Sequence, residues 1–418
     1  MTRPRATRRR PPRRTPRDRT RRTGPGLRRR SAPRARADAR GKPASRRLDG
    51  GILAPAALLT GVGIIMIYSA TAPLAIGEMV PPHFVRHLLA VGLALVCAAV
   101  ATRIPLVAWR RIAVPLWAVG VVLLAATLVA GVEVNGARRW LALPGIPVRF
   151  QPAELAKWAT VLAVAALLAK TSERGARPWR AALALVVPPV GLLLLQPDFG
   201  SAALVVMLVA LMLFAAGMPL RRLVAAAAAA CVGTGAYAAL RPYALTRWKG
   251  FLDPWQTSGD EGFQLVQSFV AIGRGGSFGV GLGGGRQKLF YLPEAHTDFI
   301  LSVVAEELGL VGVLVVLGAF AALIVAGTRI ARRARDPFAL LVAFGMTALI
   351  VMPAAVNAAV VMGLLPTTGF PLPFLSLGGN SLLTCALALA ILLRIGSREA
   401  APRGRQVAGA APRGLVAS

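Results

Sequence analysis

The sequence has few acidic residues, few cysteines and few histidines, and the shortage of cysteine and histidine argues against disulfide and metal sites. Only 17 Asp and Glu residues accompany 49 Lys and Arg residues, which gives a formal net charge of +32. Cys97, Cys231 and Cys385 stand alone within apolar runs, so neither a disulfide framework nor a cysteine-based metal cluster is expected. His83 and His87 have the spacing of one helix face but no third ligand, which favours a position beside a membrane over a zinc site.

Apolar residues are what the chain has in excess. They make up 56% of its 418 residues, the mean hydropathy is +0.61, and they fall in runs of about 20, a length typical of membrane-spanning helices. The first run begins only near Ile52, too late for a secretory signal peptide. We therefore predict an all-α polytopic membrane protein with ten spans, at approximately 52–69, 85–101, 112–131, 152–169, 180–196, 199–217, 222–240, 299–327, 337–363 and 381–395.

The two ends of the chain differ from this membrane part, residues 51–396. Residues 1–50 contain 20 basic and 3 acidic residues, a net +17 of the +32, together with many prolines. Such a segment has almost nothing to bury, so we predict a disordered cytoplasmic tail, and a second one at 397–418. A nucleic-acid-binding arm is the alternative, but attraction to anionic lipid explains the arginines, and no nucleic-acid partner is expected.

The distribution of positive charge predicts the orientation of the spans. If the Arg-rich tail is cytoplasmic, every cytoplasmic link is basic, as the positive-inside rule requires. These links are 102–111, 170–179, 218–222, 328–336 and the tail after Arg394. An even number of spans then places both termini in the cytoplasm.

Two links on the predicted outer side break the charge rule. The link 132–151 carries Arg138, Arg139 and Arg149, and arginines without a topological reason suggest an anionic ligand such as phosphate. The alternative is that they pair with nearby glutamates or lipid headgroups. The link 241–297 is long for a compact membrane protein, which suggests a functional loop. Within it, the apolar spacing of FQLVQSFVAIG predicts a short helix at the membrane interface.

The segment YLPEAHTDFILSVVAEELG places titratable groups directly before the eighth span. Glu294, His296 and Asp298 lie within five residues of one another and can shift one another's pKa, which suggests acid–base work. The alternative is that Thr297 or Asp298 caps the helix. Capping explains one polar residue but not the cluster.

Two further motifs in this region have alternative interpretations. Glu306 and Glu307 lie about two helical turns deeper, where carboxylates need a wet cavity or a buried partner and by default mark a functional path. The segment GVGLGG, residues 279–284, fits G-x-G-x-x-G, but no strand precedes it, so a dinucleotide site is excluded. Tight turns and close backbone approach are the preferred explanation, and a phosphate-binding nest is the alternative.

Most of the polar residues outside the basic links map to the outer side. In QPAELAK, Glu154 and Lys157 are spaced i, i+3, which an ion pair within the helix would also explain. The set on the outer face comprises Arg138, Arg139, Arg149, Lys157, Asp198 of the QPDFG hairpin, Arg286, Lys288, Glu294, His296 and Asp298, joined by the turn-rich segment 366–381. Cations beside a carboxylate base, open to lipid, suit a polar substrate carried on a lipid pyrophosphate.

Five segments resemble the SEDS family (FtsW/RodA/SpoVE). They are NGARRWL, FQPAELAKWA, QPDFGSA, the block from FLDPWQTSGDEG to SVVAEELG, and GLLPTTGFPLPFLSLGGNSLL. The resemblance covers about residues 50–396, and GRQK…YLPEAHTDFI is similar to the division-type branch more than to the elongation-type branch. Ala153, Leu377 and Asn380 depart from residues common in the family, so local substrate contacts are expected to differ at these positions.

The resemblance implies a ten-helix peptidoglycan glycosyltransferase that polymerises lipid II on the outer face of the bacterial cytoplasmic membrane, at the division septum. It implies that Asp298 is the catalytic base and that a class B penicillin-binding protein is the partner. Cations would stabilise the leaving pyrophosphate, either Arg139, Arg149, Lys157 and Arg286 or a divalent ion, Mg²⁺ or Mn²⁺. Further candidate substrate contacts are Trp140, Glu154, Gln264, Gln267, Thr297 and Ser376.

Two other function classes remain open from the sequence. A lipid II flippase or transporter would also have ten spans and acids within the membrane. A non-catalytic scaffold of the division machinery would tolerate loss of Asp298 but not of partner-facing helices. Crowding of the polar residues on one side favours the polymerase over the transporter.

Overall fold

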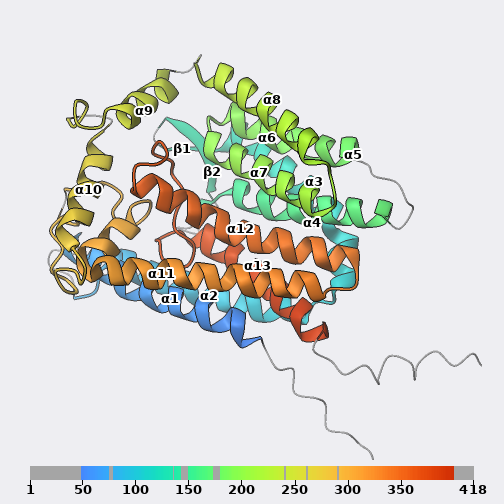
Figure 1. The fold of residues 1–418 in the computed structure, drawn as a ribbon, viewed down its shortest axis with the longest axis horizontal. Helices are drawn as coiled ribbons and strands as arrows, with labels where there is room; N and C mark the ends of the chain where they lie inside the picture. Colours follow the sequence, from blue (N-terminus) through green and yellow to red (C-terminus); the bar gives the residue numbers. More distant parts are fainter. Residues whose placement is uncertain are drawn as a thin grey trace, which may run out of the picture. The chain divides into compact units, whose positions relative to one another are not determined.

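Apolar helices of membrane-spanning length make up most of the structure, a computed structural model (Figure 1). It describes residues 49–74, 79–134, 136–142, 149–172, 179–239, 242–259, 262–289 and 291–399. The predicted tails at 1–50 and 397–418 lie almost entirely outside the described residues. The membrane part belongs to one compact unit, Arg46–Ser418.

All ten predicted spans are helical. They are α1 (Gly50–Thr71), α2 (Pro82–Arg103), α3 (Leu106–Ala130), α4 (Pro152–Ser172), α5 (Trp179–Ala184) with α6 (Val187–Leu195), α7 (Phe199–Ala215), α8 (Leu220–Ala239), α11 (Ile300–Arg333), α12 (Pro337–Val361) and α13 (Gly379–Glu399). Seven of them, α1–α4 and α11–α13, are long and apolar enough to cross a bilayer. The fifth predicted span is divided into α5 and α6, where Pro188 falls in the first turn of α6, a position that proline tolerates. The chain is a polytopic membrane protein.

Aspartates begin three of the spans. The side chains of Asp49, Asp198 and Asp336 accept hydrogen bonds from the backbone N–H groups of Gly51, Ser201 and Phe338, at 2.9, 3.0 and 3.1 Å, at the starts of α1, α7 and α12. Each bond satisfies an N–H that the first helical turn leaves without an intrahelical partner, and the negative charge favours the positive end of the helix dipole.

The core lies around α12, which packs against α4, α7, α11 and α13. Large apolar side chains such as Phe338 and Met346 are fully buried there. On the outward faces of the helices, apolar side chains are exposed instead, for example Leu89 at 69%, Val122 at 66% and Leu314 at 58%. Exposed apolar surface on this scale suits contact with lipid and not with water.

A small antiparallel sheet in the link 132–151 was not predicted. Its strands, in the order β1-β2-β3, are β1 (Val132–Val134), β2 (Ala137–Ala142) and β3 (Arg149–Phe150). Val132 pairs with Trp140, and Leu141 pairs with Phe150. Each strand is too short for an alternating pattern to register in the sequence. The all-α prediction holds for the membrane part, and the sheet is an addition to it.

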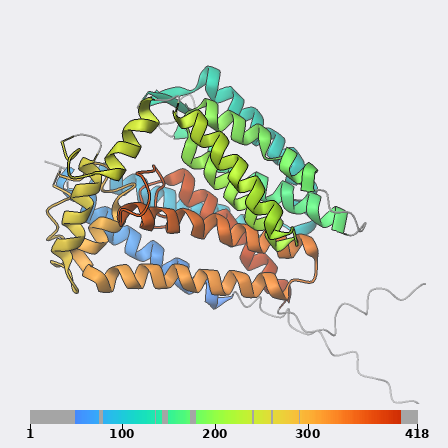
Figure 2. The same cartoon turned by 45° about the horizontal axis from the view of Figure 1, so that its top comes forward.

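The described part of the long link 241–297 is helical in two places. It contains α9 (Pro242–Leu252) and α10 (Phe263–Gly275), and α10 confirms the predicted short helix. Both ends of the described chain lie at one end of the helices with the α11–α12 link, while α10 lies at the other (Figures 1 and 2). This arrangement fits the charge-based prediction that both termini are on the same side, opposite the long link.

Candidate active site

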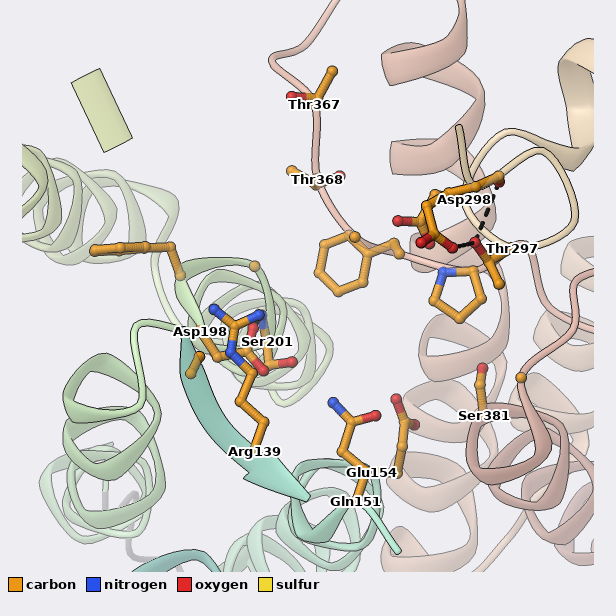
Figure 3. A pocket seen from close by; sticks show the side chains of 18 of the residues that line it. Arg139, Gln151, Glu154, Asp198, Ser201, Thr297, Asp298, Thr367, Thr368 and Ser381 are labelled. Atoms are coloured by element: carbon orange, nitrogen blue, oxygen red, sulfur yellow. Dashed lines mark hydrogen bonds between the residues drawn. The ribbon is translucent and has the colours of Figure 1, made fainter. Parts of the chain in front are cut away.

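A cavity of about 2090 Å³ opens between the outer ends of the helices. Its lining includes ten of the predicted site residues: Arg139, Trp140, Arg149, Glu154, Lys157, Asp198, Gln264, Glu294, Thr297 and Asp298. In Figure 3, Thr297 and Asp298 lie on one wall, facing Arg139, Asp198 and Ser201 across the cavity, with Gln151 and Glu154 between the two walls. Residues from five separate segments of the chain are thus brought to one space.

A tight turn presents Asp298 to this cavity. The carbonyl of Glu294 accepts hydrogen bonds from the backbone N–H groups of Thr297, at 3.1 Å, and Phe299, at 3.2 Å. Glu294 has a φ of 55°, a left-handed conformation that costs free energy in a residue other than glycine. Its carboxylate accepts a hydrogen bond from the Thr297 hydroxyl at 2.6 Å. Backbone strain of this kind occurs where the surrounding structure enforces it, often at functional sites.

Three consecutive carbonyls hold this turn in place. The carbonyl of His296 accepts from the N–H of Leu377 at 2.9 Å, and that of Thr297 from the Ser376 hydroxyl at 2.5 Å. The carbonyl of Asp298 accepts from the Asn357 amide at 2.6 Å. The backbone of the turn is therefore fixed to α12 and to the 366–378 segment, while the Asp298 side chain stays directed at the cavity.

The surroundings of the Asp298 carboxyl raise its pKa to about 7. Burial is the largest cause, because it disfavours the charged form, and the nearby negative charge of Glu294 acts in the same direction. The positive charge of Arg247 opposes them. The 366–371 segment packs closely, since a Cβ added to Gly369 would lie 3.5 Å from Oδ2 of Asp298. The site thus holds a carboxyl that gains and loses its proton near neutral pH.

The opposite wall is built on the QPDFG hairpin. Arg139 donates to the carbonyls of Gln196, at 3.1 Å, and Pro197, at 2.5 Å. The Gln196 amide in turn donates to the carbonyl of Leu124 at 2.8 Å. Asp198 caps α7, as described above. Arg139 and Asp198 line the cavity, but the contacts they make within the protein hold the hairpin.

Glu154 and Lys157 form a buried ion pair in the lining of the cavity. Lys157 Nζ lies 2.6 Å from Glu154 Oε1, and the two side chains are 4% and 11% exposed. The Lys157 ammonium also lies 5.9 Å from the centre of the Phe370 ring, a cation–π arrangement. The ion pair within the helix that the spacing allowed is therefore present, and it faces the cavity.

Six predicted site residues lie outside the cavity lining. They are Arg138, Gln267, Arg286, Lys288, His296 and Ser376. Arg138 pairs at the surface with Glu133 at 3.5 Å, as the alternative explanation required. Ser376 supports the turn from behind. The placement of Lys288 in a phosphate site is corrected, because its ammonium is paired with Glu307. The backbone N–H of Arg286 donates to Glu306, but its side chain is exposed, so its role at a phosphate stays a prediction.

His296 lies behind the turn, against His83. The two ring centres are 5.5 Å apart. Burial lowers the pKa of His296, while Glu294 raises it and His83 lowers it further. The cluster of three titratable groups is thus divided, with Glu294 and Asp298 at the cavity and His296 outside its lining.

Neither Thr297 nor Asp298 caps α11. The helix begins at Ile300, with Phe299 at the N-cap position and no side-chain cap bond. The capping alternative is therefore wrong, and the Asp298 carboxylate is left to face the cavity.

Glu306 and Glu307 have buried partners instead of a wet cavity. Both are 0% exposed. Glu306 accepts from the N–H groups of Arg286 and Gln287, and Glu307 accepts from the Lys288 ammonium and the Ser69 hydroxyl. Their prediction as markers of a functional path is replaced by these contacts, because the glycine-rich segment places its donors on the two carboxylates of α11.

The residues of the site that were not predicted individually include Arg86, Arg247, Asn357 and Asn380. Arg86 and Arg247 add cations to the lining, and Arg247 donates to the carbonyl of Thr367 at 2.8 Å. Asn380, one of the departures from the family pattern, donates to the carbonyl of Arg149 at 2.9 Å. Asn357 could have been predicted from the sequence, because a lone amide within a membrane span needs buried hydrogen-bond partners. Arg247 could not have been predicted, because no local sequence pattern shows which arginine of the link 241–297 lies at the cavity.

The described residues contain no group of three or more His, Cys, Asp or Glu side chains that could hold a metal ion. Carboxylates at the cavity are instead engaged singly, with Glu154 paired to Lys157 and Asp198 capping α7. Mg²⁺ typically needs one or two carboxylates and takes its other ligands from substrate phosphates and water. The described side chains therefore fit a cation brought by a phosphate-bearing substrate better than a resident one.

Several curated relatives of this chain carry the same name. The profile of the family FTSW_RODA_SPOVE, described as "Cell cycle protein", matches residues 51–401. A Halomonas elongata protein named probable peptidoglycan glycosyltransferase FtsW is 40% identical over 373 residues, which cover 87% of this chain and 94% of that protein. A protein of the same name from Trichlorobacter lovleyi is 43% identical over 347 residues, covering 81% and 90%.

Two solved structures share the fold. One is a chain of a peptidoglycan synthase complex that coordinates polymerization and crosslinking, with a TM-score of 0.71 and 32% identity, covering 85% of this chain and 99% of that one. The other is the rod shape determining protein RodA of Thermus thermophilus, with a TM-score of 0.63 and 31% identity, covering 86% and 100%.

Proposed function

Because this chain belongs to the FtsW/RodA/SpoVE family of cell cycle proteins, we propose that it is a peptidoglycan glycosyltransferase of the FtsW type. Its substrate is lipid II, the disaccharide peptide carried on undecaprenyl pyrophosphate, which it joins into glycan strands during cell division. It works on the outer face of the cytoplasmic membrane, and we place it at the septum.

The observation that carries the proposal is the Asp298 carboxyl, directed into a large cavity with a pKa near 7. A general base works best when its pKa lies near the operating pH. Five cationic residues line the same cavity, namely Arg86, Arg139, Arg149, Lys157 and Arg247. Apolar side chains of α7, including Val206 and Met207, also contribute to the lining. Base, cations and apolar surface together match a reaction on a lipid pyrophosphate.

The reaction follows from this arrangement as a single displacement. Ionised Asp298 takes the proton from the sugar 4-hydroxyl of one lipid II, and that oxygen attacks C1 of the sugar on the growing strand. The C1–O bond to undecaprenyl pyrophosphate breaks, with inversion at C1. Negative charge on the departing pyrophosphate is stabilised by the arginines of the lining. The proton stays on Asp298 until it exchanges with solvent.

A divalent cation remains part of the proposal only as a companion of the substrate. Mg²⁺ or Mn²⁺ bound to the pyrophosphate would add positive charge at the leaving group, with Glu294 as the carboxylate of the lining that would hold it. No step above depends on it.

The contacts of Glu306 and Glu307 favour an enzyme over a transporter. A carrier of a charged headgroup needs polar groups along a path through the bilayer. The two deep carboxylates that suggested such a path instead accept hydrogen bonds from other residues of the chain.

The fold is shared with a chain of a peptidoglycan synthase complex, so we propose that a transpeptidase of the class B penicillin-binding proteins is the partner.

The test is a glycan-polymerisation assay with the purified full chain and its transpeptidase partner, with and without divalent cation. Wild-type protein should form polymer from lipid II, and Asp298→Asn should not, although it folds. Movement of lipid II across liposomes without polymer formation would support the transporter instead. A variant that polymerises at the wild-type rate would show that Asp298 is not the base.

A further inference from the structure

The segment 276–288, which precedes the Asp298 turn, is hydrogen-bonded along its length to Glu306 and Glu307. Glu306 Oε1 accepts from the N–H of Arg286 at 2.8 Å, and Oε2 accepts from the N–H of Gln287 at 3.1 Å. Glu307 Oε2 accepts from the N–H of Gly283 at 3.0 Å. We call Glu306, Glu307 and the segment 276–288 the carboxylate clamp.

Charged partners neutralise the clamp. The Lys288 ammonium, 4% exposed, lies 2.6 Å from Glu307 Oε1 and donates to the Ser69 hydroxyl, also at 2.6 Å. That hydroxyl donates to Glu307 at 2.8 Å, which ties the clamp to α1. Arg274 on α10 lies 3.6 Å from Glu306. Buried carboxylates are tolerated only when paired and hydrogen-bonded, and both conditions are met here.

The backbone of the segment is also inserted into the hydrogen bonding of α11. The helix is interrupted at Gly309, which has a φ of 66°. Leu310 and Val311 donate to the carbonyls of Gly276 and Ser277, at 2.9 and 3.2 Å, instead of to residues four positions back. The carbonyls of Glu306 and Glu307, to which Leu310 and Val311 would donate in an unbroken helix, instead accept from the N–H groups of Val280 and Gly281 at 3.0 and 3.1 Å.

The glycines of GVGLGG make this insertion sterically allowed. Gly279 has a φ of 80°, and a Cβ added to it would collide with the carbonyl of Glu307. Of the donors that a phosphate-binding nest would offer, the N–H groups of Val280 and Gly281 donate to the backbone carbonyls of Glu306 and Glu307, and that of Gly283 donates to the Glu307 carboxylate. The motif therefore serves the clamp.

The chain between Lys288 and Glu307 forms a closed circuit, because it contains the Asp298 turn and both of its ends belong to the clamp. From Lys288 the chain runs through Leu292, which donates to the carbonyl of Gln287 at 2.8 Å, to the turn and into the helical piece 300–308. The Lys288–Glu307 ion pair joins the two ends of this circuit. Asp298 lies between them, nine residues before Glu307.

We propose that Glu306 and Glu307, with Lys288, are positioning residues of the polymerase, which act through the segment 276–288 to hold the Asp298 turn at the cavity. The inference rests on the proposed function, because the position of Asp298 matters only if it is the base. The hydrogen bonds to the carbonyls of residues 296–298 fix the turn on the side of α12, and the clamp fixes it on the side of α1 and α10.

The test uses Glu306→Gln in the full chain with its partner. One oxygen of the carboxylate becomes an N–H₂ group, which cannot accept from the backbone N–H that it faces. We expect kcat to fall about 10- to 100-fold, because small misplacements of a reacting group cost this much, with KM unchanged within about threefold. The acid limb of the pH–rate profile should move to lower pH as Asp298 becomes hydrated.

Hydrogen exchange checks the mechanism without reference to activity. Amide protection should drop about tenfold or more in Glu306→Gln at Arg286 or at Gln287, whichever N–H then faces the new N–H₂ group, because Arg286 and Gln287 donate to different oxygens of Glu306. The matched control is Glu133→Gln, which makes the same change in the surface pair with Arg138 and should leave kcat and the pH profile at wild-type values. The double variant Glu307→Gln/Lys288→Met removes the ion pair without leaving an unpaired buried charge, and it replaces Glu306→Gln if that variant does not fold.

The outcomes separate the two proposals. If amide protection falls while kcat and the pH profile stay at wild-type values, the clamp is only structural and the inference is wrong. Unchanged protection overturns it as well. If wild-type protein and the Glu133→Gln control also form no polymer, the proposed function itself fails.

Discussion

Replacing Asp298 by asparagine is expected to abolish activity and to stabilise the protein at the same time. The carboxyl has a pKa of about 7, roughly three pH units above the ordinary value for aspartate, near 3.9. Each pH unit corresponds to about 1.4 kcal/mol, so ionising Asp298 in the folded protein costs about 4 kcal/mol. Asparagine has nearly the same shape and carries no charge, so the variant avoids this cost.

The sign of the effect follows from proton binding. Between about pH 4 and pH 7 the folded protein holds a proton on Asp298 that the unfolded chain has released, so stability falls as the pH rises through this range. Above pH 7 the whole cost is present. The advantage of Asp298→Asn over wild type should therefore be about 2 kcal/mol larger at pH 8.5 than at pH 5.5.

Thermal unfolding in detergent at the two pH values, with a polymerisation assay on the same samples, measures both effects. The gap in Tm should widen by a few °C from pH 5.5 to pH 8.5, and polymerisation should fall by about 100- to 10,000-fold. Asp336→Asn is the control, since asparagine caps α12 as well as aspartate does, and its Tm should follow wild type at both values. A Tm gap that is constant or shrinks as the pH rises would refute the argument from burial.

Three further predictions concern the same site. Glu294 raises the pKa of Asp298, so Glu294→Gln should move the acid limb of the pH–rate profile to lower pH. Arg247 lowers that pKa, so Arg247→Gln should move the acid limb to higher pH. Shifts in the same direction would contradict this reasoning. Asn357→Ala leaves two carbonyls without donors and should lower stability by about 2–4 kcal/mol, measured as a fall in Tm, with reduced kcat; an unchanged Tm would contradict it. Lys157→Met leaves the buried Glu154 carboxylate without its cation and should lower stability by about 3–5 kcal/mol, again measured as a fall in Tm. Adding Glu154→Gln should restore most of the lost stability.

The arrangement of helices could be predicted from the sequence because its causes are local. Runs of apolar residues and the positions of arginines fix which segments span and which ends share a side, and all ten predicted segments are helices. The outer-face site was predicted in outline for the same reason, since Lys157 and Asp298 lie at the outer ends of predicted spans and Arg139 lies in an outer link between two of them. Contacts within the site were harder to predict. Asp198 and Glu154 were predicted as ligand contacts, and the structure gives each of them a partner three residues away.

The features of the site that could not be predicted from the sequence depend on contacts between distant segments. Lys288 pairs with a residue 19 positions away and with Ser69, which is 219 positions away. No periodicity in the loop indicates that it folds back onto α11, so its cations were assigned to a substrate. Likewise, Arg247 approaches Asp298 from the far side of the long link, and only the three-dimensional arrangement reveals that it affects the pKa of the carboxyl.

The break at Gly309 makes the segment 276–288 unusual among surface loops in its tolerance of change in length. Loops generally accept insertions and deletions, because their backbones bond mainly to water. Here the N–H groups of Val280, Gly281, Gly283, Arg286 and Gln287 each meet a particular acceptor on α11. One added residue would put every later donor out of register, as it would in a β-strand. Relatives of this chain should therefore vary in the composition of this segment but keep its number of residues.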